Sequence, residues 1–232
     1  MKKIGFIGAF DKTDMLIQLA KILTEAGKKT IVVDSTTTQK AKYVVPVINP
    51  TRTYLTEFEG FDVAVGFQDF EGMKYYIGIE NDDELDYDIA LIDVDDSEMF
   101  ENFGLKEAYI NYFVTSFDLF SLKRGLEVVS GFTSQMYLRK ILFSREMSKE
   151  EDDYLNFISR NYPIEWEENK IYFPLEMGDQ SAIIEGQRTS KVKFKNLSSQ
   201  YKDGLLDVSA EILEDKSTGD IKRIIRSIEK GV

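Results

Sequence analysis

The chain of 232 residues contains no cysteine and no histidine. Without cysteine it can form no disulfide and has no thiolate nucleophile. Without histidine it lacks the commonest metal ligand and general base. Zinc sites, serine–histidine triads and cysteine–histidine pairs are therefore excluded.

Two further features are missing: an apolar run long enough to span a bilayer, and a charged-then-apolar leader at the start. We therefore expect a cytosolic protein, with a peripheral position at the inner face of the membrane as the alternative. The net charge of −12 repels phosphates, so nucleic acid is not an expected partner. We interpret the acidic clusters at 80–88 and 150–153 as a solvated loop and a helix start rather than as metal sites.

The first 35 residues contain the pattern of a strand, a turn, a helix and a second strand. An apolar run at 3–8 is followed by helical spacing at 14–27, with Gly27 where a left-handed helix end favours glycine. A β-branched run at 30–34 completes a βαβ unit. In such a unit the turn Gly8–Thr13 faces the ligand crevice, because N–H groups at a helix start favour anions.

The rest of the chain continues to alternate between the two periodicities. We expect strands at 54–58, 62–67, 88–93, 108–114, 136–143 and 170–173, and helices from about 97 and at 115–129, 148–161, 180–186, 202–214 and 221–230. The first two of these strands predict a hairpin at a sheet edge. The pattern indicates one α/β domain over residues 1–232, a three-layer, mostly parallel twisted sheet with helices on both faces.

The turn after the first strand contains part of a Walker A loop, G-x-x-x-x-G-K-[ST]. In that loop glycines let backbone amides surround the phosphates, the lysine contacts the β- and γ-phosphates, and the hydroxyl binds magnesium. Gly8, Lys12 and Thr13 fit these roles. Asp11 stands at the glycine position before the lysine, where it brings negative charge and could neutralise Lys12.

The same turn also contains part of the dinucleotide fingerprint G-x-G-x-x-G, which requires an acid about twenty residues later. Asp34 is placed as that acid, but Phe10 and Thr13 occupy the second and third glycine positions. Phe10 would obstruct a pyrophosphate. A third interpretation is that the turn only starts a helix. These residues alone do not decide among the three.

The order of motifs along the chain resembles the MinD/ParA family of P-loop ATPases, the deviant Walker A group that includes CpaE/TadZ-like pilus-assembly members. Four segments carry the resemblance: IGAFDKT at 7–13, VDST at 33–36, ALID at 90–93 and VTSFDLFSLKRG at 114–125. A late strand with a proline, IYFPLEMGD at 171–179, follows in the family's order. The resemblance implies a P-loop NTPase-like sheet of seven or eight strands, mostly parallel.

The resemblance also implies roles for single residues. Gly8 and Lys12 would bind phosphate, Thr13 would ligate magnesium, and Asp93 would hold magnesium through water as the Walker B acid. Asp34 would lie near the magnesium-bound water.

Three family positions carry different residues in this chain. The signature lysine that reaches the partner's nucleotide falls on Ile7, the second switch acid falls on Thr36, and an asparagine near adenine falls on Ser144. Phosphoryl transfer depends on positive charge arranged around the γ-phosphate. We therefore expect little or no ATP hydrolysis.

The C-terminal segment Ile221–Val232 has isoleucines on one helical face and basic residues around it, with Asp220 as a candidate cap. The MinD branch ends in an amphipathic membrane-targeting helix, so peripheral membrane contact is one hypothesis. We favour a helix packed on its own domain or on a partner, because ten residues without an aromatic anchor bind membranes weakly.

We therefore expect a degenerate MinD/ParA-like protein that acts as a positioning or assembly scaffold through protein partners. A homodimer and a role in pilus assembly are part of this expectation. If it has a cofactor, that cofactor is ATP with magnesium. The alternatives are an active ATPase that dimerises on ATP and a dinucleotide-dependent oxidoreductase.

Overall fold

The computed structural model describes residues 1–47, 51–79 and 83–231. The strands are β1 Lys2–Ile7, β2 Thr30–Asp34, β3 Tyr54–Phe58, β4 Phe61–Val65, β5 Ile89–Val94, β6 Ile110–Thr115, β7 Met136–Leu142 and β8 Ile164–Tyr172. The helices are α1 Thr13–Glu25, α2 Ala41–Val44, α3 Phe70–Ile77, α4 Ser97–Asn102, α5 Leu119–Ser130, α6 Lys149–Ser159, α7 Met177–Thr189, α8 Ser199–Ile212 and α9 Thr218–Lys230, with a 3-10 turn, η1, at Leu105–Glu107.

The strands form one eight-stranded sheet in the order β3-β4-β2-β5-β1-β6-β7-β8. Every neighbouring pair is parallel except β3–β4, which is the expected hairpin at the edge. The α/β fold class and the mostly parallel sheet are therefore confirmed. One detail matters for the site: β5 lies between β1 and β2, so the strands of the first βαβ unit are not neighbours.

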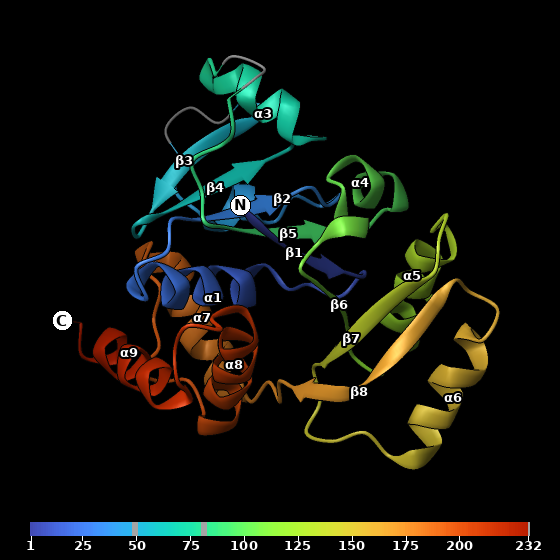
Figure 1. The fold of residues 1–232 in the computed structure, drawn as a ribbon. Coiled ribbons are helices and arrows are strands. Elements are labelled where there is room, and N and C mark those ends of the chain that lie inside the picture. The colour runs from blue at the N-terminus through green and yellow to red at the C-terminus, as the bar shows by residue number, and fades with distance from the viewer. Residues whose placement is uncertain (48–50, 80–82, 232) are drawn as a thin grey trace.

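Helices cover both faces of this sheet (Figure 1). One face packs against α1, α7, α8 and α9, and the other against α3, α4, α5 and α6. Alternate residues of a strand point to opposite faces, so Phe6 belongs to the first core and Ile7 to the second. Both faces of the central strands are buried, which explains their continuous apolar runs.

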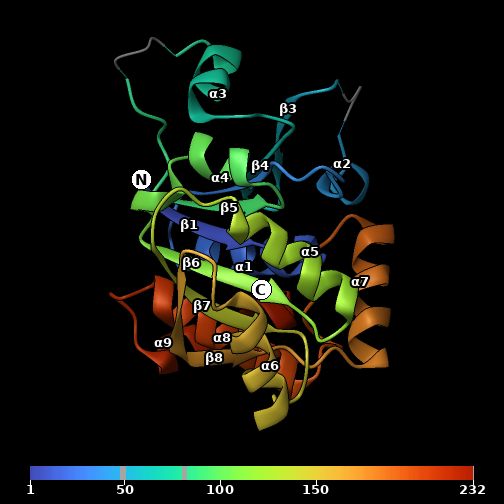
Figure 2. The same ribbon diagram turned by 90° about the vertical axis from the view of Figure 1, so that its right-hand side faces the viewer.

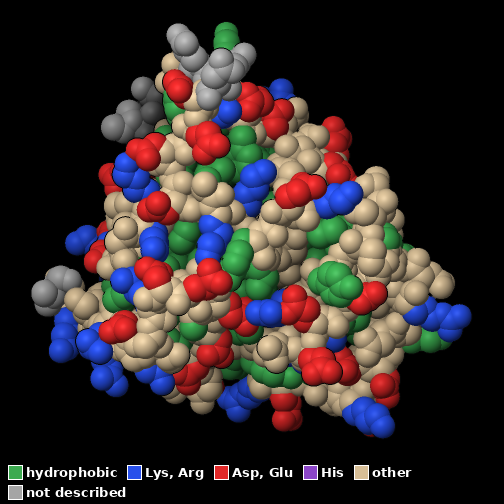
Figure 3. Space-filling model, viewed as in Figure 1, with side chains coloured by type: hydrophobic (Ala, Val, Ile, Leu, Met, Phe, Trp, Pro, Cys, Tyr) green, Lys and Arg blue, Asp and Glu red, His purple; other side chains and the backbone are tan. Residues whose placement is uncertain are grey.

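The carboxyl ends of the parallel strands meet at one edge of the sheet. Figure 2 shows α2 and α7 flanking this edge on the same side of the molecule. On the face shown in Figure 3, acidic and basic side chains are interspersed over most of the surface, and several basic side chains gather at the lower left, over α9. No helix in the described part of the chain is long and apolar enough to cross a membrane.

Several helix starts depend on local capping. Ser148 and Glu151 form the capping box that their spacing indicates, and Gly27 has the expected positive φ of 88°. The cap of α9 is Ser217 rather than Asp220, which takes the third helical position of the box. Residues 150–153 lie at the start of α6, as expected, whereas 80–82 fall outside the described residues.

The last strand is longer than its sequence pattern indicates. β8 runs over nine residues, because the segment from Ile164 is paired with β7 from its beginning. The register then shifts: Leu138 pairs with Trp166, and Lys140 pairs with Lys170. Between these two pairs, three residues of β8 therefore oppose one of β7, and this bulge interrupts the periodicity of two that identifies a strand.

The apolar face of α9 packs on its own domain. Ile221 and Ile225 are buried, and Ile224 and Ile228 pack against the same core as α1 and α8. The isoleucines that suggested membrane contact therefore pack against the core of the protein, and the basic residues occupy the outer face of the helix. Val232 lies outside the described residues.

We predict that Ile221→Ala lowers the free energy of unfolding by about 3 kcal/mol, because it removes buried methyl groups and leaves a cavity. Lys222→Ala, at the exposed neighbouring position, should change it by less than about 0.5 kcal/mol. Denaturant titration of both variants measures the difference. Equal effects of the two substitutions would contradict the packing of α9.

Candidate functional site

The loop Gly8–Lys12 connects β1 to α1 at the carboxyl edge of the sheet. Gly8 has φ +131°, and a Cβ there would lie 2.5 Å from the carbonyl oxygen of Val114. Its N–H donates to the oxygen of Val94 at 3.1 Å. Only glycine fits between β5 and β6 in this conformation, so Gly8 holds the start of the loop against both neighbouring strands.

The loop presents a run of unpaired backbone donors. Within the described chain, no group accepts a hydrogen bond from the N–H of residues 9–12. The next N–H, of Thr13, donates to Asp11 Oδ1 at 3.2 Å. Successive backbone donors before a helix form the kind of concave surface that binds anions.

Lys12 and Asp93 form a buried ion pair at the end of β1 and β5. Lys12 Nζ lies 2.6 Å from Asp93 Oδ1, and the two side chains are 2% and 4% exposed. Lys12 Nζ also donates to the carbonyl oxygen of Gly8 at 2.8 Å. The sequence predicted both residues for one site, and the pairing of β1 with β5 brings them together.

Burial raises the pKa of the Asp93 carboxyl to about 7, and the charge of Lys12 acts in the opposite direction. Asp34 adds to the rise through charge repulsion. Because the folded form holds this proton more tightly than an unfolded chain, Asp93 favours folding below pH 3.8. That contribution is lost as the pH rises from 3.8 to about 7.

The buried carboxylate of Asp34 accepts hydrogen bonds from the segment that follows β2. Its Oδ1 accepts from the Thr36 N–H at 3.1 Å and from the Thr36 hydroxyl at 2.6 Å, and its Oδ2 accepts from the Ala41 N–H at 2.9 Å. Asp34 is 1% exposed and does not line the cavity beside the loop. It shapes the segment after β2, and the geometry gives no support to the ribose-binding role of the dinucleotide interpretation.

A cavity of about 380 Å³ lies beside the loop. It is lined by Gly8, Ala9, Phe10, Asp11, Lys12, Thr13, Thr36, Thr38, Lys40, Tyr43, Asp93 and Asp95. Gly8, Lys12, Thr13 and Asp93 from the predicted site are therefore together at one cavity. Asp34 lies in the wall behind it.

The oxygens at this cavity suit a magnesium ion that arrives with a phosphate. Asp93 Oδ1 is buried, and the Lys12 ammonium lies 2.6 Å from it. Thr13 supplies a hydroxyl from the first turn of α1. Oxygen ligands from one carboxylate and one hydroxyl, completed by water and phosphate, are the usual set for magnesium. No cluster of three or more acidic side chains that could hold an ion occurs among the described residues.

Asp11 pairs with Lys40, not with Lys12 as its sequence position suggested. Lys40 Nζ lies 2.5 Å from Asp11 Oδ2 and 2.6 Å from Asp14 Oδ2. Burial opposes the charge of Lys40, but the two carboxylates outweigh burial and raise the pKa of Lys40. Gln187 of α7 donates to both oxygens of Asp14, at 2.8 and 3.1 Å.

A second cavity of about 340 Å³ shares Phe10, Asp11 and Lys40 with the first. It continues between α1 and α7, where Phe10 packs against Phe143 with ring centroids 4.4 Å apart. Ser144 stands where the family has an asparagine near adenine. Its hydroxyl donates a hydrogen bond to the carbonyl oxygen of Glu146 on the surface.

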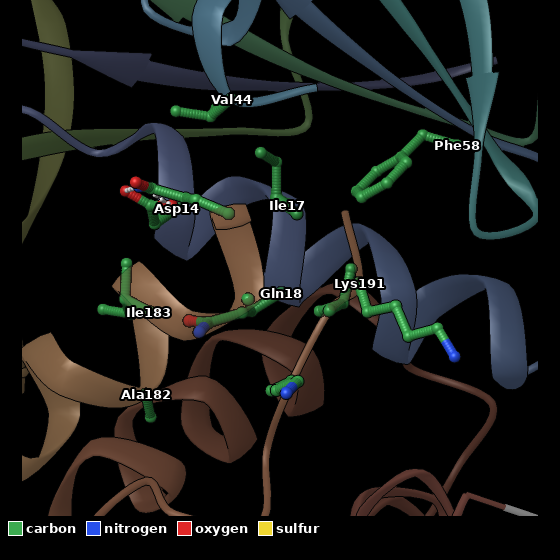
Figure 4. Close-up of a pocket in the computed structure, with 12 residues that line it drawn as sticks. Asp14, Ile17, Gln18, Val44, Phe58, Ala182, Ile183 and Lys191 are labelled. Carbon is green, nitrogen blue, oxygen red and sulfur yellow. Dashed lines mark hydrogen bonds between the residues drawn. The ribbon is translucent and has the colours of Figure 1, made fainter. Parts of the chain in front are cut away.

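A third, narrow crevice lies deeper between α1 and α7 (Figure 4). Asp14 and Gln18 reach it from α1 and Ile183 from α7. Its volume of about 30 Å³ holds about one water molecule. Gln18 Oε1 is buried there without a partner in the described structure, so a water is the fitting occupant.

Sequence reasoning missed two cavity residues of clear consequence, Lys40 and Asp95. Asp95 accepts from the N–H of Thr37 at 2.9 Å and from its hydroxyl, and so ties the segment after β2 to the end of β5. Two acids directly after a buried strand were a usable signal for Asp95. Lys40 is 29 residues from Asp11, and no sequence pattern links them.

We predict that the Asp93 carboxyl carbon titrates near pH 7 in ¹³C NMR spectra, about three units above an ordinary aspartate. Lys12→Met should move this midpoint higher, because it removes the positive charge that lowers the pKa.

Lys40→Met is the matched control, since Lys40 pairs with Asp11 and Asp14 and not with Asp93. A midpoint that falls in Lys12→Met, or moves equally in both variants, would contradict the ion pair.

No family model and no curated sequence matches the chain. Solved structures do. A ParA family ATPase from Chlorobium tepidum TLS matches with TM-score 0.57 and 14% identity, over 90% of this chain and 98% of that one. MinD in its complex with MinC from Aquifex aeolicus matches with TM-score 0.58 and 12% identity, over 94% and 97%.

A plasmid partition protein from Borrelia burgdorferi B31 bound to AMPPNP matches with TM-score 0.58 and 10% identity, over 93% of this chain and 99% of that one. These matches span almost the full length of each chain. The chain therefore has the P-loop fold of the ParA and MinD ATPases.

Proposed function

We propose that this chain is a positioning or assembly scaffold of the MinD/ParA type, one domain over residues 1–232, that binds ATP with magnesium and hydrolyses it slowly or not at all. The buried pair of Lys12 and Asp93 beside the loop carries the proposal. It keeps a phosphate-binding lysine and a magnesium-holding acid next to unpaired backbone donors. In this role Lys12 turns from Asp93 toward the phosphates.

The geometry at two other positions supports slow hydrolysis. Ile7 is fully buried in the core between β1 and the helices of the second face, so that position supplies no charge to a phosphate. Thr36 donates its hydroxyl to Asp34 and adds no carboxylate for the attacking water. The γ-phosphate would then lack two of the groups that stabilise charge in the transition state.

Magnesium has a specific part in this proposal. Asp11, Asp93 and Asp95 line the cavity beside two lysines. An unneutralised triphosphate would meet net negative charge there. Bound magnesium supplies positive charge that offsets the carboxylates and polarises the phosphate oxygens. Thr13 and Asp93 would hold it, and the AMPPNP bound to the plasmid partition neighbour supports nucleotide binding by a protein of this fold.

The proposed output is a protein contact, with a second copy of the chain or with another protein. One structural neighbour is the complex of MinD with MinC, which supports binding to another protein as the function of this fold. A pilus-assembly role belongs to the same proposal. Membrane contact does not, because the apolar face of α9 is packed inside.

We predict that ATP with magnesium raises the melting temperature, because a ligand bound only by the native state stabilises it. Lys12→Met should abolish the shift. Turnover should be on the order of 10⁻³ s⁻¹ or slower, the range of P-loop proteins that lack an activating group. Thermal-shift and phosphate-release assays measure the two quantities.

Lys28→Met is the control, since Lys28 pairs with Asp215 at the opposite edge of the sheet. It should keep the full shift. Lys12-dependent ATP turnover far above this range would contradict the scaffold proposal and support the alternative of an active ATPase. A shift with NAD or NADP but not with ATP would support the dinucleotide alternative and sink the proposal.

A further inference from the structure

The loop before α1 already places a carboxylate at the start of this helix. Asp11 Oδ1 accepts the N–H of Thr13 at 3.2 Å, and Asp11 Oδ2 lies 2.5 Å from Lys40 Nζ. A helix N–H and a lysine ammonium are the two kinds of partner that a bound phosphate uses at this place in a fold. The carboxylate therefore occupies contacts that a phosphate oxygen would make.

Lys40 differs from Lys12 in how available it is. Lys12 is 2% exposed and is held by Asp93 and Gly8, whereas the side chain of Lys40 is 31% exposed and borders both large cavities. Lys40 comes from the segment between β2 and α2, and its ion pairs with Asp11 and Asp14 connect that segment to the loop and to α1. An ammonium has three donors, so Lys40 can keep Asp14 and exchange Asp11 for another anion.

We infer that Asp11 competes with a bound phosphate for Lys40. While Asp11 is paired with Lys40, this lysine is not available to the phosphate. When a polyphosphate enters the cavity, Lys40 leaves Asp11 for the phosphate and stays anchored to Asp14. Lys40 thereby supplies, from the same chain, positive charge that Ile7 cannot. This inference rests on the proposed function, because it concerns the same cavity and the same ligand class.

The competition is local and electrostatic. Asp11 contributes a full negative charge at the cavity wall, and its exposed side chain can move away without disturbing the core. Asp11→Asn keeps an oxygen for the Thr13 N–H but removes the charge. The helix start should therefore persist, while Lys40 loses its competing anion.

The experiment measures the affinity for ATP with magnesium by calorimetry in wild type, Asp11→Asn, Lys40→Met and the double variant. We expect Asp11→Asn to tighten binding at least about tenfold, since removing a like charge within a few ångströms of a phosphate is worth that much near a protein surface. In the Lys40→Met background the same substitution should increase the affinity clearly less. The four affinities form a double-mutant cycle that measures the coupling of the two residues.

Asp215→Asn is the matched control. It removes the same charge from an aspartate that also pairs with a lysine, Lys28, at 3.0 Å and at the opposite edge of the sheet. It should leave the affinity within about twofold of wild type. Circular dichroism melts of all variants confirm that each is folded.

The outcomes separate the inference from the proposed function. If wild type binds and Asp11→Asn binds no tighter, the inference falls and the proposed function stands. If Asp11→Asn tightens binding equally with and without Lys40, Lys40 is not the withheld cation and the inference also falls. If neither wild type nor Asp11→Asn binds at millimolar nucleotide, both fall. Binding by Asp11→Asn alone, dependent on Lys40, supports a self-blocked site.

Discussion

The position of β5 between β1 and β2 is the constraint on which the site depends. It sets Asp93 beside the loop that follows β1, and the ion pair with Lys12 follows from that adjacency. In the doubly wound dinucleotide-binding order, by contrast, the first two strands are direct neighbours, with no strand between them. The same sheet order therefore separates the two nucleotide interpretations that the residues of the turn leave open.

The buried pair also limits what the site can do. Two charges out of water are held only because each has the other, and either alone would be an uncompensated buried charge. Burial brings the pKa of Asp93 to about 7, so the pair is at the border of neutralisation near physiological pH. A phosphate that draws Lys12 away leaves Asp93 in need of another cation, and magnesium is one that arrives with the phosphate.

Much of the fold is predictable because its signals are local. Continuous apolar runs such as 89–92 fit strands buried on both faces, and Ser148 with Glu151 identifies the start of α6 within four residues. The bulge in β8 and the pairing of Lys40 with Asp11 have no local signal. The first depends on the register of β7, and the second on how the segment after β2 folds over the loop. Asp34 is a further example. Its position at the end of a strand was predictable, but the hydrogen bonds that it accepts from Thr36 and Ala41 were not.

The contact of Gln187 with Asp14 joins α7 to the charged residues at the loop. Asp14 is the anchor of Lys40, so the geometry of α7 and the readiness of Lys40 to meet an anion form one thermodynamic cycle. A protein that docks on α7 and alters this contact will change phosphate affinity by some factor, and phosphate must then change the affinity for that protein by the same factor. A partner bound to α7 would thus respond to occupancy of the neighbouring cavity.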